Sequence, residues 1–276
     1  MRAIDVRHQG REKVICCWEV DGVLIDPGPG VTEETLLAAL GGERPRALLL
    51  THIHFDHAGV SGALVRRWPD LPVYVHERGA PHLVDPSRLM ASAGRLYGGD
   101  EGLRALWGEM VPLPEENLRV LQGGETDVEG AFRVEYTPGH ASHHVCYFHE
   151  PSRWAFVGDV GGARIPPHEF TVAPTPPPDI DVAAWKASIA LVRAWEPVAL
   201  GLTHFGEAGP DQLDRALEAL DIQVELEGST DGEAGFVAAM EQRVRAGCGE
   251  DADAMLAATP LDQLHMGLAR WRKKFG

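Results

Sequence analysis

The sequence is poor in cysteine and in basic residues, and both shortages exclude classes of protein. It holds four cysteines in 276 residues, and none of them forms a Cys-x-x-Cys pair. This excludes a disulfide framework and a cysteine-ligated zinc site, so Cys16, Cys17 and Cys146, which sit in apolar runs, are expected in the core. The 25 basic residues are outnumbered by 41 acidic ones, which gives a net charge of −16. Because nucleic-acid binders need basic surfaces, no nucleic acid is expected as a partner.

Long apolar runs are also missing. No uninterrupted apolar stretch approaches the roughly 20 residues that a helix needs to cross a bilayer. The first residues, Met1–Val6, lack the apolar core of a signal peptide. We therefore expect no membrane partner and a cytoplasmic location. The apolar fraction of 44% is ordinary for a globular protein that buries a substantial core.

Histidine is abundant, with 13 residues, and the densest group of histidines follows an apolar run. Residues 47–50 predict a buried strand, and His52, His54, Asp56 and His57 come after it. Burying three imidazoles and a carboxylate together costs free energy unless something pairs with them. A metal ion does so most directly, because neutral imidazole and carboxylate are both good zinc ligands. The pattern therefore favours a metal site over a polar surface loop.

An apolar run that ends in a polar residue recurs three more times. The residues that follow these runs are His140, Asp159 and His204. Loops that leave neighbouring strands converge at one edge of a sheet, so the three side chains are expected to join the first cluster. Gly139 and Gly158 precede two of them and permit tight turns of the backbone.

The spacing of these residues divides them between two metal ions. His52 and His54 are two positions apart, so in an extended loop they project to the same side. Asp56 and His57 come after the chain turns, and they face a second position. We therefore predict that one metal ion is held by a first group, His52, His54 and His140. A second group, Asp56, His57 and His204, would hold the other ion, and Asp159 would bridge the two. Two metal ions about 3.5–4 Å apart form a hydrolytic centre.

This set of motifs resembles the metallo-β-lactamase-fold hydrolases. The motifs are Thr51-His52-x-His54-x-Asp56-His57, Thr137-Pro138-Gly139-His140, Gly158-Asp159 and Thr203-His204, and the resemblance covers roughly residues 10–206. It implies an α/β fold, a four-layer αββα sandwich with the dinuclear site at one edge of two sheets. The segments 80–87 and 140–144 resemble a branch related to glyoxalase II and to acyl-homoserine lactonases.

Departures from the family patterns prevent any known substrate from being carried over. The lactonases have a tyrosine three residues after the bridging aspartate, where this chain has Gly162. Glyoxalase II has a lysine about nine residues after it, where this chain has His168. His54 departs from the glutamate of the flavodiiron branch.

The predicted mechanism uses a metal-bridging hydroxide, because metal ions lower the pKa of bound water toward ~7. Asp56 could also carry a proton to the leaving group. His144, four residues after His140, either orients a ligand by a hydrogen bond or is a plain strand histidine. Arg164 could grip an anionic substrate group or lie on the surface, and His168 could reach the site from the loop rich in proline.

The expected function is a dinuclear metal-dependent hydrolase of an ester, thioester or lactone in a small metabolite. One alternative is a phosphodiesterase or phosphotriesterase on the same site. Another is a mononuclear iron dioxygenase of persulfides, or a metal-binding protein without catalysis. Zinc is the expected metal because nitrogen and oxygen ligands suit it, with iron or manganese as alternatives.

We predict a catalytic domain at residues 1–209 and a helical C-terminal extension at 210–276. The extension would pack against the core or against a partner in a homodimer. A helical insertion at 78–116 and the Pro-rich loop at 166–178 form either a lid or added core. The expected strands are 14–20, 23–26, 47–50, 73–75, 132–136, 145–148, 154–157 and 198–202, and the expected helices are 32–40, 60–67, 181–194, 211–224, 234–245 and 253–274.

Overall fold

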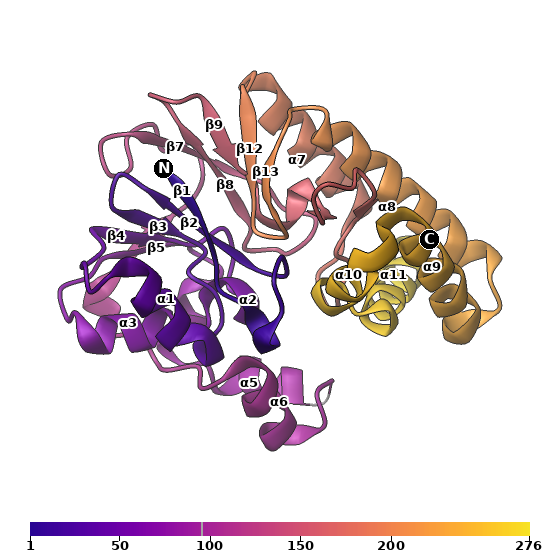
Figure 1. Ribbon diagram of the computed structural model, residues 1–276, viewed down its shortest axis with the longest axis horizontal. Helices are drawn as coiled ribbons and strands as arrows, with labels where there is room; N and C mark the ends of the chain where they lie inside the picture. Colours follow the sequence, from indigo (N-terminus) through magenta and orange to yellow (C-terminus); the bar gives the residue numbers. More distant parts are fainter. Residues whose placement is uncertain (95) are drawn as a thin grey trace.

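Two β-sheets form the centre of the molecule, with helices over their outer surfaces (Figure 1). The computed structural model describes residues 1–94 and 96–276. The first sheet has the strand order β1-β2-β3-β4-β5-β6, the second β13-β12-β9-β8-β7, and β10 pairs with β11. The strands are β1 Arg2–Asp5, β2 Cys16–Val20, β3 Val23–Ile25, β4 Ala47–Leu49, β5 Val73–His76, β6 Leu118–Leu121, β7 Phe132–Tyr136, β8 Val145–His149, β9 Trp154–Phe156, β10 Ala163–Arg164, β11 Thr171–Val172, β12 Ala199–Leu202 and β13 Gly206–Ala208.

Alternation of side chains along the strands fills a core on each face of each sheet. In β4, Leu48 packs with the helices outside the first sheet, whereas Leu49 lies in the core between the two sheets. Trp18 from the first sheet and Phe156 from the second meet in that inner core. Successive residues of a strand point to opposite faces, so a wholly apolar strand must be covered on both sides. The expected αββα sandwich is confirmed.

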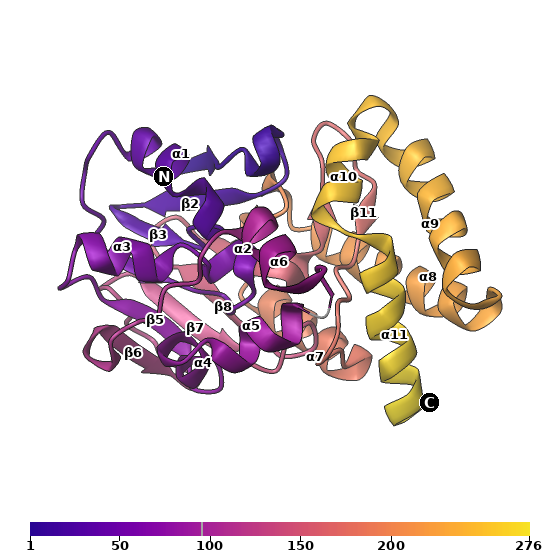
Figure 2. The same cartoon turned by 90° about the horizontal axis from the view of Figure 1, so that it is seen from below.

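Helices complete the outer layers. On the first sheet lie α1 Glu33–Leu40, α2 Phe55–Ala58 and α3 Ser61–Arg67, and on the second lies α7 Val182–Ala194. The insertion forms α4 Ala80–Val84, α5 Ser87–Gly94 and α6 Gly99–Trp107, and the C-terminal extension forms α8 Gln212–Ser229, α9 Gly232–Cys248, α10 Ala252–Ala258 and α11 Leu261–Phe275. Figure 2 shows α10 and α11 on the side of the extension that faces α5 and α6.

Parallel pairing brings the ends of four strands to one edge. β3 runs parallel to β4 in the first sheet, and β9 runs parallel to β12 in the second. The carboxyl ends of parallel neighbours lie at the same edge, so the loops that leave these strands are close together. This edge carries the predicted ligands.

Several local predictions hold and others are wrong. Asp181 caps α7 as expected, because its carboxylate accepts a hydrogen bond from the amide of Ala184 at 3.0 Å. Thr32 precedes α1, but its hydroxyl donates to the carbonyl of Pro29 at 2.9 Å instead of capping the helix. The single helix expected at 253–274 is two helices, since Pro260 has no amide hydrogen to continue α10. The sequence analysis also missed five short strands, β1, β6, β10, β11 and β13.

Two further expectations concern the core and the membrane. Cys16, Cys17 and Cys146 are fully buried, as predicted for small core residues. Within residues 1–94 and 96–276, no helix combines the length and the apolar character required to cross a membrane.

The extension has an apolar core whose contribution can be measured. Phe236 is fully buried in α9, whereas Phe275 at the end of α11 is 52% exposed. We expect Phe236→Ala to lower the free energy of unfolding by about 3–5 kcal/mol, because it removes a buried ring and leaves a cavity. Phe275→Ala, the matched control, should change it by less than about 0.5 kcal/mol. Denaturant titration checks both values, and equal effects would contradict the packing described.

Candidate metal centre

The seven predicted ligands lie together at the edge where strands of both sheets end. His52 and His54 lie in the loop after β4, and Asp56 and His57 lie in the short helix α2 that follows it. The second sheet supplies the other three from the ends of β7, β9 and β12, and they are His140, Asp159 and His204. The sequence places all seven here because each follows an apolar strand.

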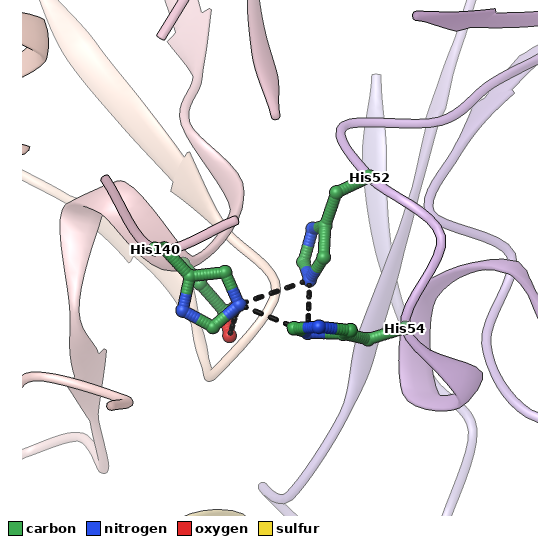
Figure 3. A group of neighbouring side chains, drawn as sticks. His52, His54 and His140 are labelled. Carbon is green, nitrogen blue, oxygen red and sulfur yellow. Dashed lines mark hydrogen bonds and ion pairs between the residues drawn. The ribbon is translucent and has the colours of Figure 1, made fainter. Parts of the chain in front are cut away.

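The first group is a triangle of imidazole nitrogens (Figure 3). Nε2 of His52 lies 2.9 Å from Nδ1 of His54 and 3.2 Å from Nε2 of His140. The third edge, from Nε2 of His140 to Nδ1 of His54, is 3.0 Å. Four ligands at about 2.0–2.1 Å from a tetrahedral zinc ion lie roughly 3.3 Å apart, which is close to these spacings.

The second group joins the first through Asp159. Oδ2 of Asp56 is 3.1 Å from Nε2 of His204 and 3.7 Å from Nε2 of His57. Oδ1 of Asp159 lies 3.1 Å from Nε2 of His57, while its Oδ2 lies 3.3 Å from Nε2 of His140. The two oxygens of one carboxylate therefore face the two groups, which is the arrangement expected of a bridging ligand.

Two buried atoms at the junction support a cation. Nε2 of His57 and Oδ1 of Asp159 are buried, and neither has a hydrogen-bond partner within the described part of the chain. Buried polar atoms are nearly always paired, so an unpaired nitrogen and oxygen that face each other indicate a missing partner. A divalent metal ion fits, because both atoms offer lone pairs to it.

The other ring nitrogen of three ligands is held by an acceptor. Nδ1 of His140 donates to the carbonyl of Pro174 at 2.8 Å, and Nδ1 of His204 donates to the carbonyl of Val14 at 2.7 Å. Nδ1 of His57 lies 2.8 Å from Oδ2 of Asp26. These bonds place the proton on Nδ1, which leaves the lone pair of Nε2 free for a metal.

Asp26 lies beside the predicted ligands, and its place there was not predicted from the sequence. It is fully buried, and Oδ2 accepts from the hydroxyls of Thr51 and Thr203 at 2.7 and 2.8 Å. Oδ1 accepts from the amide of Thr51 at 2.8 Å. Asp26 follows β3 as Asp159 follows β9, so the same signal, a carboxylate after an apolar strand, could have identified it.

The pKa values of the histidines are shifted in opposite directions in the two groups. Burial lowers the pKa of His52 well below its ordinary value and that of His54 to about 4, and neighbouring imidazoles add to both effects. Burial also opposes charge on His57, but three carboxylates, Asp159 foremost, outweigh it and raise its pKa. The first group is therefore neutral, whereas the carboxylates around the second group favour a positive charge beside them, which a metal ion would supply in place of a proton.

Of the two alternatives predicted for His144, the hydrogen bond to a ligand is not present among the described residues. Its Nδ1 lies 2.9 Å from the hydroxyl of Thr137, and its Nε2 is buried without a partner in the described chain. The ring instead packs against His52, with centroids 5.1 Å apart. This contact supports the His52 ring by packing, and a catalytic role for His144 stays a prediction.

A cavity opens over the site, and two other candidate residues, Arg164 and His168, do not line it. His54, Asp56 and Asp159 line its floor. Arg164 lies elsewhere, where its guanidinium donates to the carbonyl of Glu207 at 2.9 Å. His168 pairs with Asp251 at 3.2 Å and does not reach the cavity. Both residues therefore lie outside the pocket.

The cavity is lined in part by the insertion and the Pro-rich loop, two segments for which the sequence left the choice between a lid and added core open. Residues of the insertion, of the Pro-rich loop and of the C-terminal extension all line it. The extension was expected only to pack on the core or on a partner, yet α11 supplies Gln263 and Leu264 to the cavity wall. No periodic pattern in the sequence distinguishes this face of α11 from an ordinary buried face.

The role of Asp26 can be tested through metal affinity. Asp26→Asn should weaken metal binding by about 10–100-fold, because an amide would face the donors that now hold the carboxylate. Competition with a chelator measures the affinity. Asp70→Asn, at a side chain that is 81% exposed, is the matched control and should bind metal normally. Unchanged affinity in Asp26→Asn would refute the supporting role.

Comparison with known proteins places this site in a family. The family model described as the metallo-beta-lactamase superfamily matches residues 19–204, which include all seven ligands. The chain is 27% identical over 225 residues to the metallo-beta-lactamase fold-containing protein ST1585 of Sulfurisphaera tokodaii, a match that covers 79% of this chain and 81% of that one.

Two further relatives match a shorter part. The probable metallo-hydrolase YqgX of Bacillus subtilis is 32% identical over 141 residues, covering 50% of this chain and 60% of YqgX. A hydroxyacylglutathione hydrolase of Salmonella paratyphi A is 31% identical over 143 residues, covering 50% of this chain and 41% of that enzyme. The match thus spans 60% or less of the length of these two proteins.

Solved structures show the same fold. The crystal structure of ST1585 has a TM-score of 0.67 at 22% identity and covers 95% of this chain and 93% of its own, so the likeness extends into the C-terminal extension. TTHA1623, solved in a di-iron-bound form, has a TM-score of 0.56 at 28% identity, covering 73% of this chain and 93% of its own. With the family model matching residues 19–204 of 276, the chain belongs to the metallo-β-lactamase superfamily.

Proposed function

We propose that this protein is a hydrolase that uses two divalent metal ions to cleave an ester, thioester or lactone of a small metabolite. The observation that carries the proposal is Asp159, whose two oxygens lie within 3.1 and 3.3 Å of ligand nitrogens from different groups. One carboxylate that serves two adjacent ions is a feature of dinuclear hydrolytic centres. Two relatives are named as hydrolases, which agrees with this reaction class.

The ions would supply a water molecule that is deprotonated near neutral pH and a positive charge that polarises the bond under attack. Zinc is the first choice for nitrogen and oxygen ligands, and the di-iron form of TTHA1623 makes iron the main alternative. His52, His54 and His140 would hold one ion, and Asp56, His57 and His204 the other.

Asp56 has a second role in the proposed reaction. Its carboxylate is 19% exposed and lines the floor of the cavity, whereas His57 beside it is fully buried. A group that touches both the metal site and the cavity can receive a proton and pass it to the leaving atom. His54 and Asp159 also reach the floor, so the reacting bond would lie over these three side chains.

The other candidate functions fit the geometry less well. A mononuclear iron dioxygenase needs one group of ligands, and here the second group is complete and is supported by Asp26. A phosphodiesterase favours cations around the phosphate, and the described residues that line the cavity include no lysine or arginine. A panel of thioesters and lactones compared with a panel of phosphodiesters separates the reaction classes.

Removal of a ligand tests the metal dependence. His54→Ala should reduce kcat/KM for the best ester or thioester by at least about 10³-fold, because one of the three nitrogens of the triangle is lost. His168→Ala, at a histidine paired with Asp251 outside the cavity, is the control and should keep wild-type activity. Steady-state kinetics, with metal content measured on the same samples, checks the prediction.

Chelation gives a second test of the same dependence. Dialysis against a chelator should abolish turnover, and added zinc, iron or manganese should restore it. Activity that persists in metal-free protein would exclude the proposal.

A further inference from the structure

The cavity above the metal centre is walled by segments that lie far apart in the sequence. They come from the loop before α2, the insertion α5–α6, the Pro-rich loop and the α10–α11 segment. Together they enclose a cavity of about 120 Å³ that is partly open to solvent. A concave, mostly apolar site with a few polar groups is typical of small-molecule binding, so an apolar group of a metabolite can be held above the ligands.

One wall is a stack of aromatic rings. Trp107 at the end of α6 stacks on Phe55, with centroids 6.4 Å apart and planes at 20°. Trp107 also stacks on the buried His8, with centroids 4.9 Å apart and planes at 9°. Tyr97 meets Trp107 edge to face at 5.8 Å. Rings held on several sides lose little freedom when they bind an apolar group, which favours such binding.

The opposite wall joins the Pro-rich loop to α11. The hydroxyl of Thr175 donates to the carbonyl of Leu264 at 3.1 Å. Gly267 lies so close that a Cβ atom there would be 1.9 Å from the carbonyl oxygen of Thr175. Pro176 and Leu264 present the apolar surface of this wall to the cavity. The wall is therefore fixed by a hydrogen bond and by close backbone packing.

A hydrogen bond links the two walls. The phenol of Tyr97, in the insertion, donates to Oε1 of Gln263 in α11 at 3.1 Å. Both residues line the cavity, so the bond fixes the separation of the walls at this point. The same bond gives the Tyr97 hydroxyl its hydrogen-bond partner. The adjoining surface can therefore be apolar.

The lining carries little charge beyond the metal ligands. Among the described lining residues, the ionisable side chains are His54, Asp56 and Asp159, which belong to the metal centre. The remaining polar side chains are the hydroxyls and amide of Ser92, Tyr97, Thr259 and Gln263 and the indole of Trp107. An anionic substituent would find no cation here besides the metal ions, and a chain of net charge −16 would repel it.

We propose that the substrate carries an uncharged, apolar group of several carbons next to the reacting bond, and that this group lies between the aromatic wall and the α11 wall. The proposal deepens the hydrolase function and rests on it. The C-terminal extension then helps to determine which substrates are accepted, through Leu264 and Gln263 on α11. The substrate class is an ester or thioester with an apolar acyl or alkyl group.

Two matched series of substrates test the proposal on the metal-loaded protein. One series lengthens the acyl group from acetyl to octanoyl on a fixed thiol, and the other lengthens the alcohol on a fixed acetyl group. In one of the two series the group that is lengthened enters the cavity. In that series kcat/KM should rise by about fourfold per methylene until the cavity is filled. A succinyl thioester should be a poorer substrate than the butanoyl thioester.

A cavity-filling variant localises the effect. Leu89→Trp narrows the cavity from α5, so the optimum chain should become shorter while metal content stays unchanged. Leu191→Trp makes the same change at an exposed leucine of α7 that does not line the cavity, and it should keep the wild-type optimum. The series measured on the wild-type protein stands even where a variant fails to fold.

Binding separates this proposal from the hydrolase function. If no ester or thioester is cleaved, calorimetry with the neutral ligand octanamide still probes the cavity. In that case the absence of turnover counts against the hydrolase, while binding at least tenfold tighter than that of acetamide, and weakened by Leu89→Trp, would support the apolar site. Turnover that is independent of chain length in both series, a preference for the succinyl substrate, or equal binding of the two amides would overturn the apolar site.

Discussion

Burial of several carboxylates and imidazoles in one place is the constraint on which the rest of the structure depends. Asp26, Asp159 and His57 meet at the edge of two sheets, where water is largely excluded. Such groups are costly to bury unless each has a partner, and the burial of one charge beside another of the same sign is costlier still. A pair of divalent cations would resolve the conflict, since each ion would accept lone pairs that the protein leaves unpaired.

Contacts at increasing distance from the predicted ligands hold these buried groups in place. The pairs of parallel strands bring the loops together, and carbonyls and Asp26 then fix the tautomers of the histidines. One connection runs as far as the C-terminal extension. His140 donates to Pro174, and the next residue, Thr175, donates to Leu264 in α11. The helix that forms a wall of the cavity therefore also braces a loop that orients a metal ligand.

The sequence predicted what depends on local pattern and missed what depends on tertiary contact. Every one of the seven predicted ligands follows an apolar strand, and this pattern can be recognised in the sequence without any knowledge of the fold. Asp26 carries the same signal, but it is followed by Pro27-Gly28-Pro29-Gly30, a sequence that is typical of a turn. The break at Pro260 was not predicted, although the missing amide hydrogen of a proline is a local signal. The contribution of α11 to the cavity was not predictable, because a buried residue looks the same in sequence whether it faces a core or a ligand.

We propose that the two ligand groups hold two ions joined by Asp159. Anomalous diffraction from crystals of the metal-loaded protein, collected at the absorption edge of the bound metal, tests it most directly. The account predicts two peaks, one among His52, His54 and His140 and one among Asp56, His57 and His204, with a carboxylate oxygen of Asp159 bound to each. A single peak, or two peaks with Asp159 bound to only one of them, would contradict it.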